Sequence, residues 1–140
     1  MTNLITPGSR VAAQPPAESR EALAHFEGLL AYESDCWDVY HDVSKGLDNF
    51  VLLDVRTPEQ WAESHIPSAI SLPHGRINER NLAEYPADTV FVTYCAGTFC
   101  NAADKAAVHL ARLGRPVKKM IGGISGWVEE GFELVSENEA

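Results

Sequence analysis

Apolar residues recur at helical spacing near the start of the chain and then give way to short, nearly continuous runs. From Ala17 this spacing predicts an amphipathic helix, whose apolar stripe is formed by Leu23, Phe26, Leu29 and Leu30. A second, shorter helix is expected after Asp35, because an aspartate side chain is a good cap for exposed helix N–H groups. Residues 1–16 are broken by prolines and show no periodicity, which indicates a loose arm or a segment that docks on the surface.

Residues 50–55 (FVLLDV) are apolar almost throughout and do not alternate with polar residues. Such runs are typical of strands that are covered on both faces, as in a parallel α/β sheet. Shorter runs predict further strands at 69–72, 89–94 and 117–121. A capping box of Thr57 and Gln60 is expected to open the helix after the first strand. Later helices are expected at 76–85, 101–113 and 124–130.

Strands that alternate with helices predict an α/β fold, in which a parallel sheet has helices on both faces. We expect this domain to occupy residues 47–135. It is preceded by an N-terminal helical extension, residues 1–46, whose arm and helices pack on the domain, and followed by a polar tail, residues 136–140. Binding sites of parallel sheets form at the carboxyl ends of the strands. The residues that follow the strands are therefore the first candidates for chemistry.

Composition and charge argue against several classes of protein. The formal net charge is -9 and the pI is about 4.9, and a surface of this sign repels nucleic acid. No apolar run approaches the roughly 20 residues of a membrane helix, and the N-terminus lacks the apolar core of a signal peptide. Cys36, Cys95 and Cys100 leave one cysteine over after any pairing. This is a poor disulfide framework, so we expect a cytoplasmic protein.

Cys95 is the strongest candidate for chemistry, because it ends a predicted buried strand just before a short loop and a helix. A loop that curls around a sulfur atom can direct several backbone N–H groups at it, and the helix dipole adds to their effect. Gly97 gives the loop the backbone freedom that such a curl requires. These features predict a lowered pKa for the Cys95 thiol and a catalytic nucleophile. The alternative interpretation is a buried structural cysteine.

Cys100 lies on the far side of the same loop and has two interpretations. It is either a resolving or sulfur-accepting thiol that attacks a persulfide on Cys95, or a small residue that fills the core at the first turn of the helix. The spacing of the two cysteines is not that of a zinc site, and no second pair exists. We therefore expect no metal and no cofactor.

Several separate motifs surround and include this loop. In chain order they are LDVR at 53–56, HIP at 65–67, CAGTFCN at 95–101 and GGISGW at 122–127. Over residues 50–128 they resemble the signatures of the rhodanese-like family of single-domain sulfurtransferases, and the loop resembles a subgroup with C-A-G-x-x-C-N. Ser64 and Ser68 stand where that family usually has glycine on either side of His65.

The resemblance implies a five-stranded parallel sheet and a persulfide on Cys95. Sulfane sulfur would come from a small-molecule donor and pass to cyanide or a thiol. The loop amides would hold the persulfide; they belong to Ala96, Gly97, Thr98, Phe99 and Cys100. Many members of the family carry an arginine or another cationic or hydroxyl residue in the second half of this loop, where this chain has no cation. A dianion such as thiosulfate then has less to pair with, so polysulfides or persulfides are the expected donors.

Four further residues are candidates for a supporting role. Asp54 and Arg56 end the first strong strand, where Arg56 either adds positive potential near the thiolate or belongs to a structural network with Glu59 or a loop carbonyl. His74 follows the second strand and is a candidate for substrate contact. His65 is expected to fix its own loop by hydrogen bonding rather than to act as an acid or base.

Two other functions compete with sulfur transfer. The first is a non-catalytic regulatory or redox-sensing module, in which Cys95 and Cys100 alternate between dithiol and disulfide. The second is a phosphatase, whose C-x5-R loop needs an arginine where this chain has Asn101, so that phosphoryl transfer would lose its main stabilising group. The N-terminal helix is, in addition, a candidate for a homodimer contact.

Overall fold

The computed structural model describes residues 7–138, and the expectations for the first residues of the arm and the last two of the tail lie outside this range. The chain divides into two compact units, residues 1–31 and 32–140. The first contains a short 3-10 turn (Val11–Ala13) and most of helix α1 (Ser19–Tyr32), which begins two residues after the expected start. The second contains the sheet and all the remaining elements.

The second unit is built on a five-stranded sheet whose neighbouring strands are all parallel, in the order β1-β5-β4-β2-β3. The strands are β1 (Glu33–Ser34), β2 (Val51–Asp54), β3 (Ile70–Ser71), β4 (Phe91–Tyr94) and β5 (Val117–Met120). The expected α/β class and five-stranded parallel sheet are therefore confirmed. The central strand β4 is buried at every residue, as a continuous apolar run requires. Its register places Thr93 beside Leu53 of β2 and Lys119 of β5.

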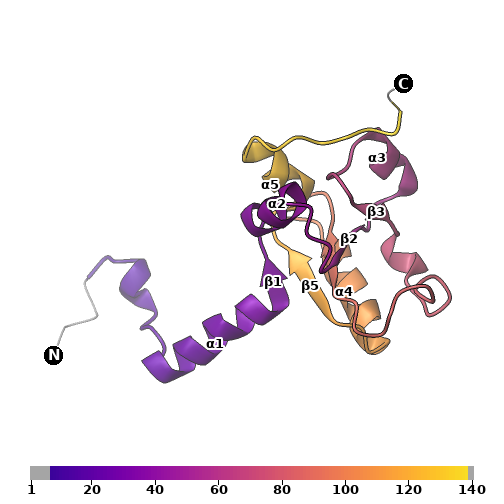
Figure 1. Cartoon of the computed structure of the whole chain (residues 1–140). Helices are drawn as coiled ribbons and strands as arrows, with labels where there is room; N and C mark the ends of the chain where they lie inside the picture. The colour runs from indigo at the N-terminus through magenta and orange to yellow at the C-terminus, as the bar shows by residue number, and fades with distance from the viewer. Residues whose placement is uncertain (1–6, 139–140) are drawn as a thin grey trace. The chain divides into compact units, whose positions relative to one another are not determined.

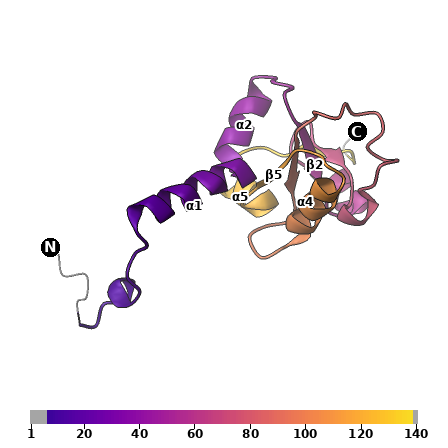
Figure 2. The same cartoon turned by 90° about the horizontal axis from the view of Figure 1, so that it is seen from below.

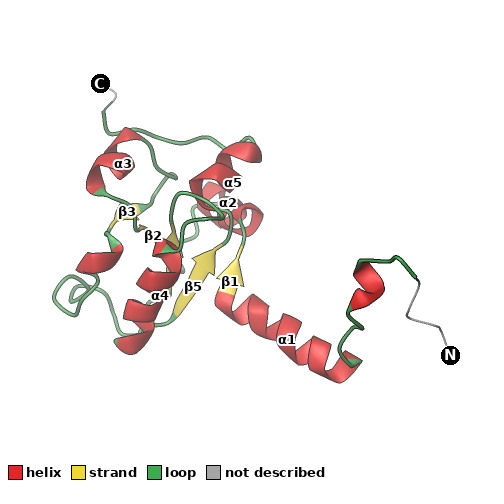
Figure 3. Ribbon diagram, turned by 180° about the vertical axis from the view of Figure 1, so that it is seen from behind, coloured by secondary structure: helices red, strands yellow, loops and turns green. Residues whose placement is uncertain are grey.

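Helices cover both faces of the sheet (Figure 1, Figure 3). Helices α2 (Cys36–Ser44) and α5 (Gly123–Glu129) lie side by side, and α3 (Pro58–Glu63) follows β2. Helix α4 (Ala102–Arg112) packs on β4 and β5, and Figure 2 shows α4 and α5 on either side of β5. The loop between β4 and α4 therefore leads from the centre of the sheet to one of its faces.

Two apolar clusters fill the space between the sheet and its helices, because successive residues of a strand point to opposite faces. Leu52 belongs to the cluster that contains Trp127 of α5, whereas its neighbour Leu53 belongs to the cluster that contains Leu110 of α4. Cys95 is part of this second cluster. The thiol predicted to be the nucleophile is thus attached to the core beneath α4.

The two predicted helix caps, Asp35 and Thr57, are confirmed, but one predicted helix is not found. Asp35 accepts a 2.8 Å hydrogen bond from the backbone N–H of Asp38, and Thr57 and Gln60 form the expected capping box. Residues 78–84 form turns instead of the helix expected at 76–85. Here the side chain of Asn78 accepts a hydrogen bond from the backbone N–H of Asn81, and such local bonds compete with the helical ones.

Candidate functional site

Cys95 follows the last residue of β4 and is 3% exposed. Its thiol donates a hydrogen bond of 3.2 Å to the backbone carbonyl of Cys100 across the loop. Cys100 itself is half-buried, and both cysteines are reduced. The strand, the loop and the start of α4 therefore bring together the two thiols that the sequence analysis singled out.

The start of α5 holds the outer side of the loop. The carbonyl of Cys95 accepts a hydrogen bond of 3.0 Å from Ile124 N–H, and the carbonyl of Ala96 accepts bonds from both the N–H and the hydroxyl of Ser125. Backbone N–H groups of Gly97 and Ala103 interact with the Cys95 thiol, and those of Ala96 and Ala102 interact with the Cys100 thiol. The start of α5 thus sets the curl that the sequence predicted around Cys95.

Gly123 makes this contact possible. It has a positive φ of 59°, and a Cβ atom at this position would lie 2.5 Å from the carbonyl oxygen of Cys95 and 2.7 Å from the nitrogen of Gly97. No side chain fits in that space. Gly122 and Gly123, at the start of α5, therefore form the surface on which the loop packs.

The two thiols differ in their pKa. Burial raises the pKa of Cys95, and its interaction with Cys100 adds to the rise, while backbone N–H groups of Ala103 and Gly97 offset part of it. The pKa of Cys100 is lowered, chiefly by the backbone N–H of Ala102. The lowered pKa that the sequence predicts for Cys95 is wrong, because this thiol is part of the core. The helix start acts most strongly on the second thiol instead.

Two cavities border the loop. The larger, of about 580 Å³, lies on its outer side between loop residues 96–100 and the α5 residues Gly122, Ser125, Gly126 and Glu129. The smaller, of about 100 Å³, has Cys95 and Cys100 in its wall, together with Asp104 and Lys119. Phe99 stands fully exposed at the tip of the loop. All five loop residues expected at the site therefore line a cavity.

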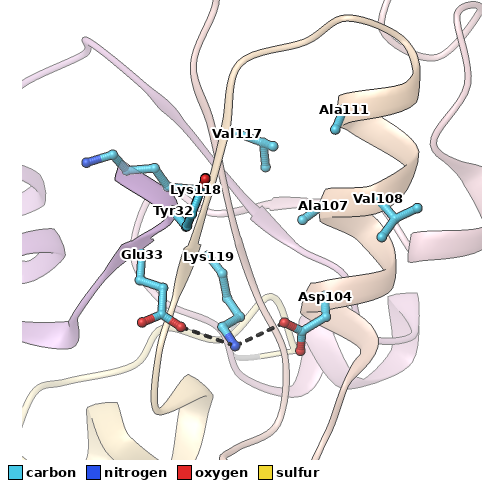
Figure 4. Close-up of a pocket in the computed structure, with 9 residues that line it drawn as sticks. All are labelled: Tyr32, Glu33, Asp104, Ala107, Val108, Ala111, Val117, Lys118 and Lys119. Atoms are coloured by element: carbon cyan, nitrogen blue, oxygen red, sulfur yellow. Dashed lines mark hydrogen bonds and ion pairs between the residues drawn. The ribbon is translucent and has the colours of Figure 1, made fainter. Parts of the chain in front are cut away.

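Lys119 is a cation near the site that the sequence did not point to. Its ammonium group lies 3.0 Å from Asp104 and 3.7 Å from Glu33 (Figure 4). Burial would lower the pKa of Lys119, but the two carboxylates outweigh it and raise the pKa. The pair of Lys119 and Asp104 also borders a groove floored by Ala107, Ala111 and Val117, which Figure 4 shows. Because the ammonium group of Lys119 is already paired with two carboxylates, it does not take the place of a loop arginine in binding an anion.

Asp54 and Arg56 form a buried network behind the loop. Asp54 is 0% exposed and accepts hydrogen bonds from Arg56, the closest at 2.7 Å, and from the hydroxyl of Tyr94 at 2.8 Å. Arg56 also donates to the carbonyl of Ser64 at 2.6 Å. Of the two partners named for the structural alternative, the loop carbonyl is the one that the geometry supplies. Since Tyr94 immediately precedes Cys95, the network fixes the end of β4.

The two candidate histidines lie outside both cavities. His65 is buried, its Nδ1 is 2.7 Å from the carbonyl of Trp61, and its ring stacks on the Trp61 indole. This agrees with the expected role in holding a loop. His74 begins a 3-10 turn (His74–Arg76), and its N–H donates to the carbonyl of Val55. Its proposed substrate contact remains a prediction.

Four residues around the loop were not predicted from the sequence. Ser125 follows the Gly-Gly pair directly and could have been found by that adjacency. Asp104, Lys119 and Glu129 come from three different elements, and only the folded chain brings them to the loop. Among residues 7–138, no group of three or more His, Cys, Asp or Glu side chains is placed to hold a metal ion. No helix in this part of the chain is long and apolar enough to cross a membrane.

Comparisons with known proteins agree with this geometry. A family model described as a rhodanese-like domain matches residues 39–130. A sulfurtransferase of Allochromatium vinosum is 33% identical over 89 residues, which cover 64% of this chain and 81% of that protein. The crystal structure of the BH2092 protein from Bacillus halodurans superposes with a TM-score of 0.82 at 42% identity, covering 84% of this chain and 86% of that one.

A further relative has a different description. The HTH-type transcriptional regulator Rv0324 of Mycobacterium tuberculosis is 42% identical over 77 residues, which cover 54% of this chain. The match spans only about a third of that regulator, 33% of its length. Similar domains thus occur both in a protein described as an enzyme and within a larger regulator.

Proposed function

The chain belongs to the rhodanese-like domain family, and from this premise we propose that it is a sulfurtransferase that carries sulfane sulfur as a persulfide on Cys95. The single observation that carries the proposal is the position of this thiol. It directly follows the central strand. The carbonyls of Cys95 and Ala96 are bound to α5, and backbone N–H groups of Gly97 and Ala103 interact with the sulfur. Sulfurtransferase activity in general is supported by the family and by the relative from Allochromatium vinosum.

The reaction has two steps of thiol exchange without net oxidation. The sulfur of Cys95 attacks the outer sulfur of a donor R–S–SH, the S–S bond of the donor breaks, and R–SH leaves. An acceptor thiol then attacks the outer sulfur of the Cys95 persulfide and restores the Cys95 thiol. Because the pKa of Cys95 is raised, its proton must be released in the first step, and the departing thiolate is the group that takes it.

The donor is a persulfide or polysulfide rather than thiosulfate. Thiosulfate is a dianion, and its recognition favours cations with several donors, such as an arginine. The loop offers Thr98, Phe99 and Cys100 at these positions, and the ammonium group of Lys119 is already paired with Asp104 and Glu33. Thr98 can contribute one neutral hydroxyl. The acceptor is a thiol or cyanide.

A regulatory or redox-sensing module is the second candidate. It is favoured by the proximity of two thiols in one loop and by the lowered pKa of Cys100, which makes this residue the readier attacking group. The regulator from Mycobacterium tuberculosis is a relative in which such a role would fit its description. In that case an oxidant would produce a reversible Cys95–Cys100 disulfide without sulfur turnover.

Turnover measured donor by donor separates the two functions. The assay compares thiosulfate, polysulfide and a low-molecular-weight thiol persulfide, with Cys95→Ser and Cys100→Ser beside the parent. A sulfurtransferase turns over with the persulfide or polysulfide, poorly with thiosulfate, and not at all as Cys95→Ser. Cys100→Ser changes the release of sulfur more than its uptake. Absence of turnover with every donor, together with a disulfide that requires Cys100, would favour the redox module.

A further inference from the structure

The side chain of Glu129 belongs to the larger of the two cavities that border the loop. Residues Gly122, Ser125, Gly126 and Glu129 line the larger cavity because residues three and four apart lie on the same face of α5. Ser125 of this face touches the loop directly through its hydrogen bonds to Ala96. Glu129 lies one turn farther along, at the end of the helix. Glu129 therefore lines the same cavity as the loop residues.

The charge of Glu129 is not compensated within the described structure. No hydrogen bond or ion pair joins its side chain to another residue among positions 7–138. The adjacent Glu130 is instead engaged by the indole N–H of Trp37 at 3.0 Å. Glu129 is also the only charged residue among the nine that line the larger cavity.

The other charges near the thiols lie elsewhere. Asp104 and Lys119 border the smaller cavity, where the ammonium group of Lys119 is paired with Asp104 and with Glu33. Lys105, in the first turn of α4, is exposed and acts on the thiol of Cys100. The larger cavity shares four bordering residues with the smaller one that contains Cys95, namely Gly97, Thr98, Cys100 and Gly122. A molecule bound in the larger cavity therefore lies next to the thiols and beside the negative charge of Glu129.

We propose that Glu129 is a specificity-determining residue, which selects sulfur carriers with a cationic group near their sulfur atom and disfavours anionic ones. The preferred ligand is an aminothiol and its persulfide, whose ammonium group pairs with Glu129 while the exposed ring of Phe99 covers the carbon chain. This inference rests on the proposed sulfur transfer through Cys95. It narrows the donor further, because polysulfide anions as well as thiosulfate would be repelled.

Three thiols of similar size but different charge test the proposal. They are cysteamine, which is cationic, 2-mercaptoethanol, which is neutral, and 2-mercaptoethanesulfonate, which is anionic. The full-length protein is first loaded with polysulfide at high concentration and desalted. Each thiol R–SH then attacks the outer sulfur of the Cys95 persulfide, giving R–S–SH and the free Cys95 thiol. The rate of this discharge is compared for each thiol between the parent and its variants at low ionic strength.

In Glu129→Gln we expect the cysteamine rate to fall about threefold and the mercaptoethanesulfonate rate to rise about threefold, which is the range of an exposed ion pair. The mercaptoethanol rate stays unchanged. Glu129→Lys inverts the preference, and added salt weakens every difference. Glu84→Gln is the matched control. It removes the same charge beside Tyr85, which packs on Phe91 at the start of β4, whereas Cys95 follows the end of β4.

The experiment distinguishes the role of Glu129 from sulfur transfer through Cys95. If no persulfide forms on the parent with polysulfide or with the neutral persulfide of 2-mercaptoethanol, sulfur transfer itself is wrong. If the persulfide forms and Glu129→Gln discharges all three thiols at the parental rates, sulfur transfer stands and the role of Glu129 is overturned. The same conclusion follows if Glu84→Gln alters the rates as much as Glu129→Gln does.

Discussion

The Cys95 thiol donates a 3.2 Å hydrogen bond to the main-chain carbonyl of Cys100, so the nucleophile is held by the residue that carries the second thiol of the loop. Only a protonated thiol can donate this bond. The pKa of Cys95 is raised, first by burial and then by a hydrogen bond with the Cys100 side chain. When Cys95 becomes a persulfide, its inner sulfur has no proton left to donate. Loading therefore breaks the bond and changes the surroundings of Cys100.

Replacing Cys100 by serine should prolong the life of the loaded persulfide. The thiolate of Cys100 can attack the inner sulfur of the Cys95 persulfide, forming an internal disulfide and releasing hydrosulfide. The variant keeps the main-chain carbonyl and loses only the attacking group. In the absence of an acceptor, we expect a persulfide half-life several times longer, followed by intact mass spectrometry. Cys36→Ala is the control that removes the thiol outside the loop. Equal half-lives for the parent and Cys100→Ser would show that Cys100 only fills space.

Gly123→Ala should damage the loop, because a Cβ atom there overlaps the carbonyl of Cys95. Gly114→Ala is its matched control, since Gly114 also has a positive φ, of 75°, but has open space around its Cβ position. Both variants lose about 1–2 kcal/mol of unfolding free energy from backbone strain. Gly123→Ala should lose about 1–3 kcal/mol more from overlap, and its persulfide should form more slowly. Urea unfolding and persulfide formation measure the two effects, and equal behaviour of the two variants would refute the contact.

Arg56→Gln should destabilise the fold more than it affects chemistry. The change leaves the fully buried carboxylate of Asp54 without its cation, which costs about 3–5 kcal/mol in comparable buried pairs. Adding Asp54→Asn should restore part of this loss, as measured by urea unfolding. Persulfide formation per folded molecule should stay close to that of the parent. A large fall in that rate, with stability unchanged, would instead assign Arg56 to the electrostatics of the thiolate.

The fold could be predicted because its signals are local. Each signal predicts the structure of its own segment. They are the apolar run at 51–54 for a strand, the capping box at Thr57 for a helix start, and Gly114 for the end of α4. The edge strand β1 could not be found from its residues, since Glu33 and Ser34 are two half-buried polar residues whose strand character comes from pairing with β5. Ser68 has a positive φ of 71° where the family usually has glycine. Because serine rarely adopts this conformation, the residue type does not predict the left-handed backbone at this position.

The site could be predicted only in part, because its chemistry depends on distances in space. The sequence places Cys95 at the end of a strand and Cys100 in the same loop, and both predictions of position agree with the structure. The direction of the Cys95 pKa was wrong, since the sequence does not reveal how deeply the thiol sits beneath α4. Glu129 and Lys119 come from elements that meet the loop only after folding.

The stability of the fold should fall in alkaline solution partly through Cys36. Burial raises the pKa of this thiol from 9.0 to about 11, with Asp35 and Glu130 adding to the rise. The folded state therefore favours the protonated thiol. This stabilisation is complete below pH 9 and is lost as the pH rises towards about 11. Between pH 8 and pH 10.5, the parent should lose about 2 kcal/mol more unfolding free energy than Cys36→Ala, measured in urea with reductant present. Parallel losses in both proteins would exclude Cys36 as the cause.

Intact mass spectrometry after incubation with a thiol persulfide tests the central claim most directly. The parent should gain the mass of one sulfur atom, the gain should map to the peptide that contains Cys95, and an added thiol should remove it. Cys95→Ser should gain nothing, while Cys36→Ala should load like the parent. A Cys95→Ser protein that takes up and releases sulfur as the parent does would contradict the assignment of Cys95 as the sulfur carrier.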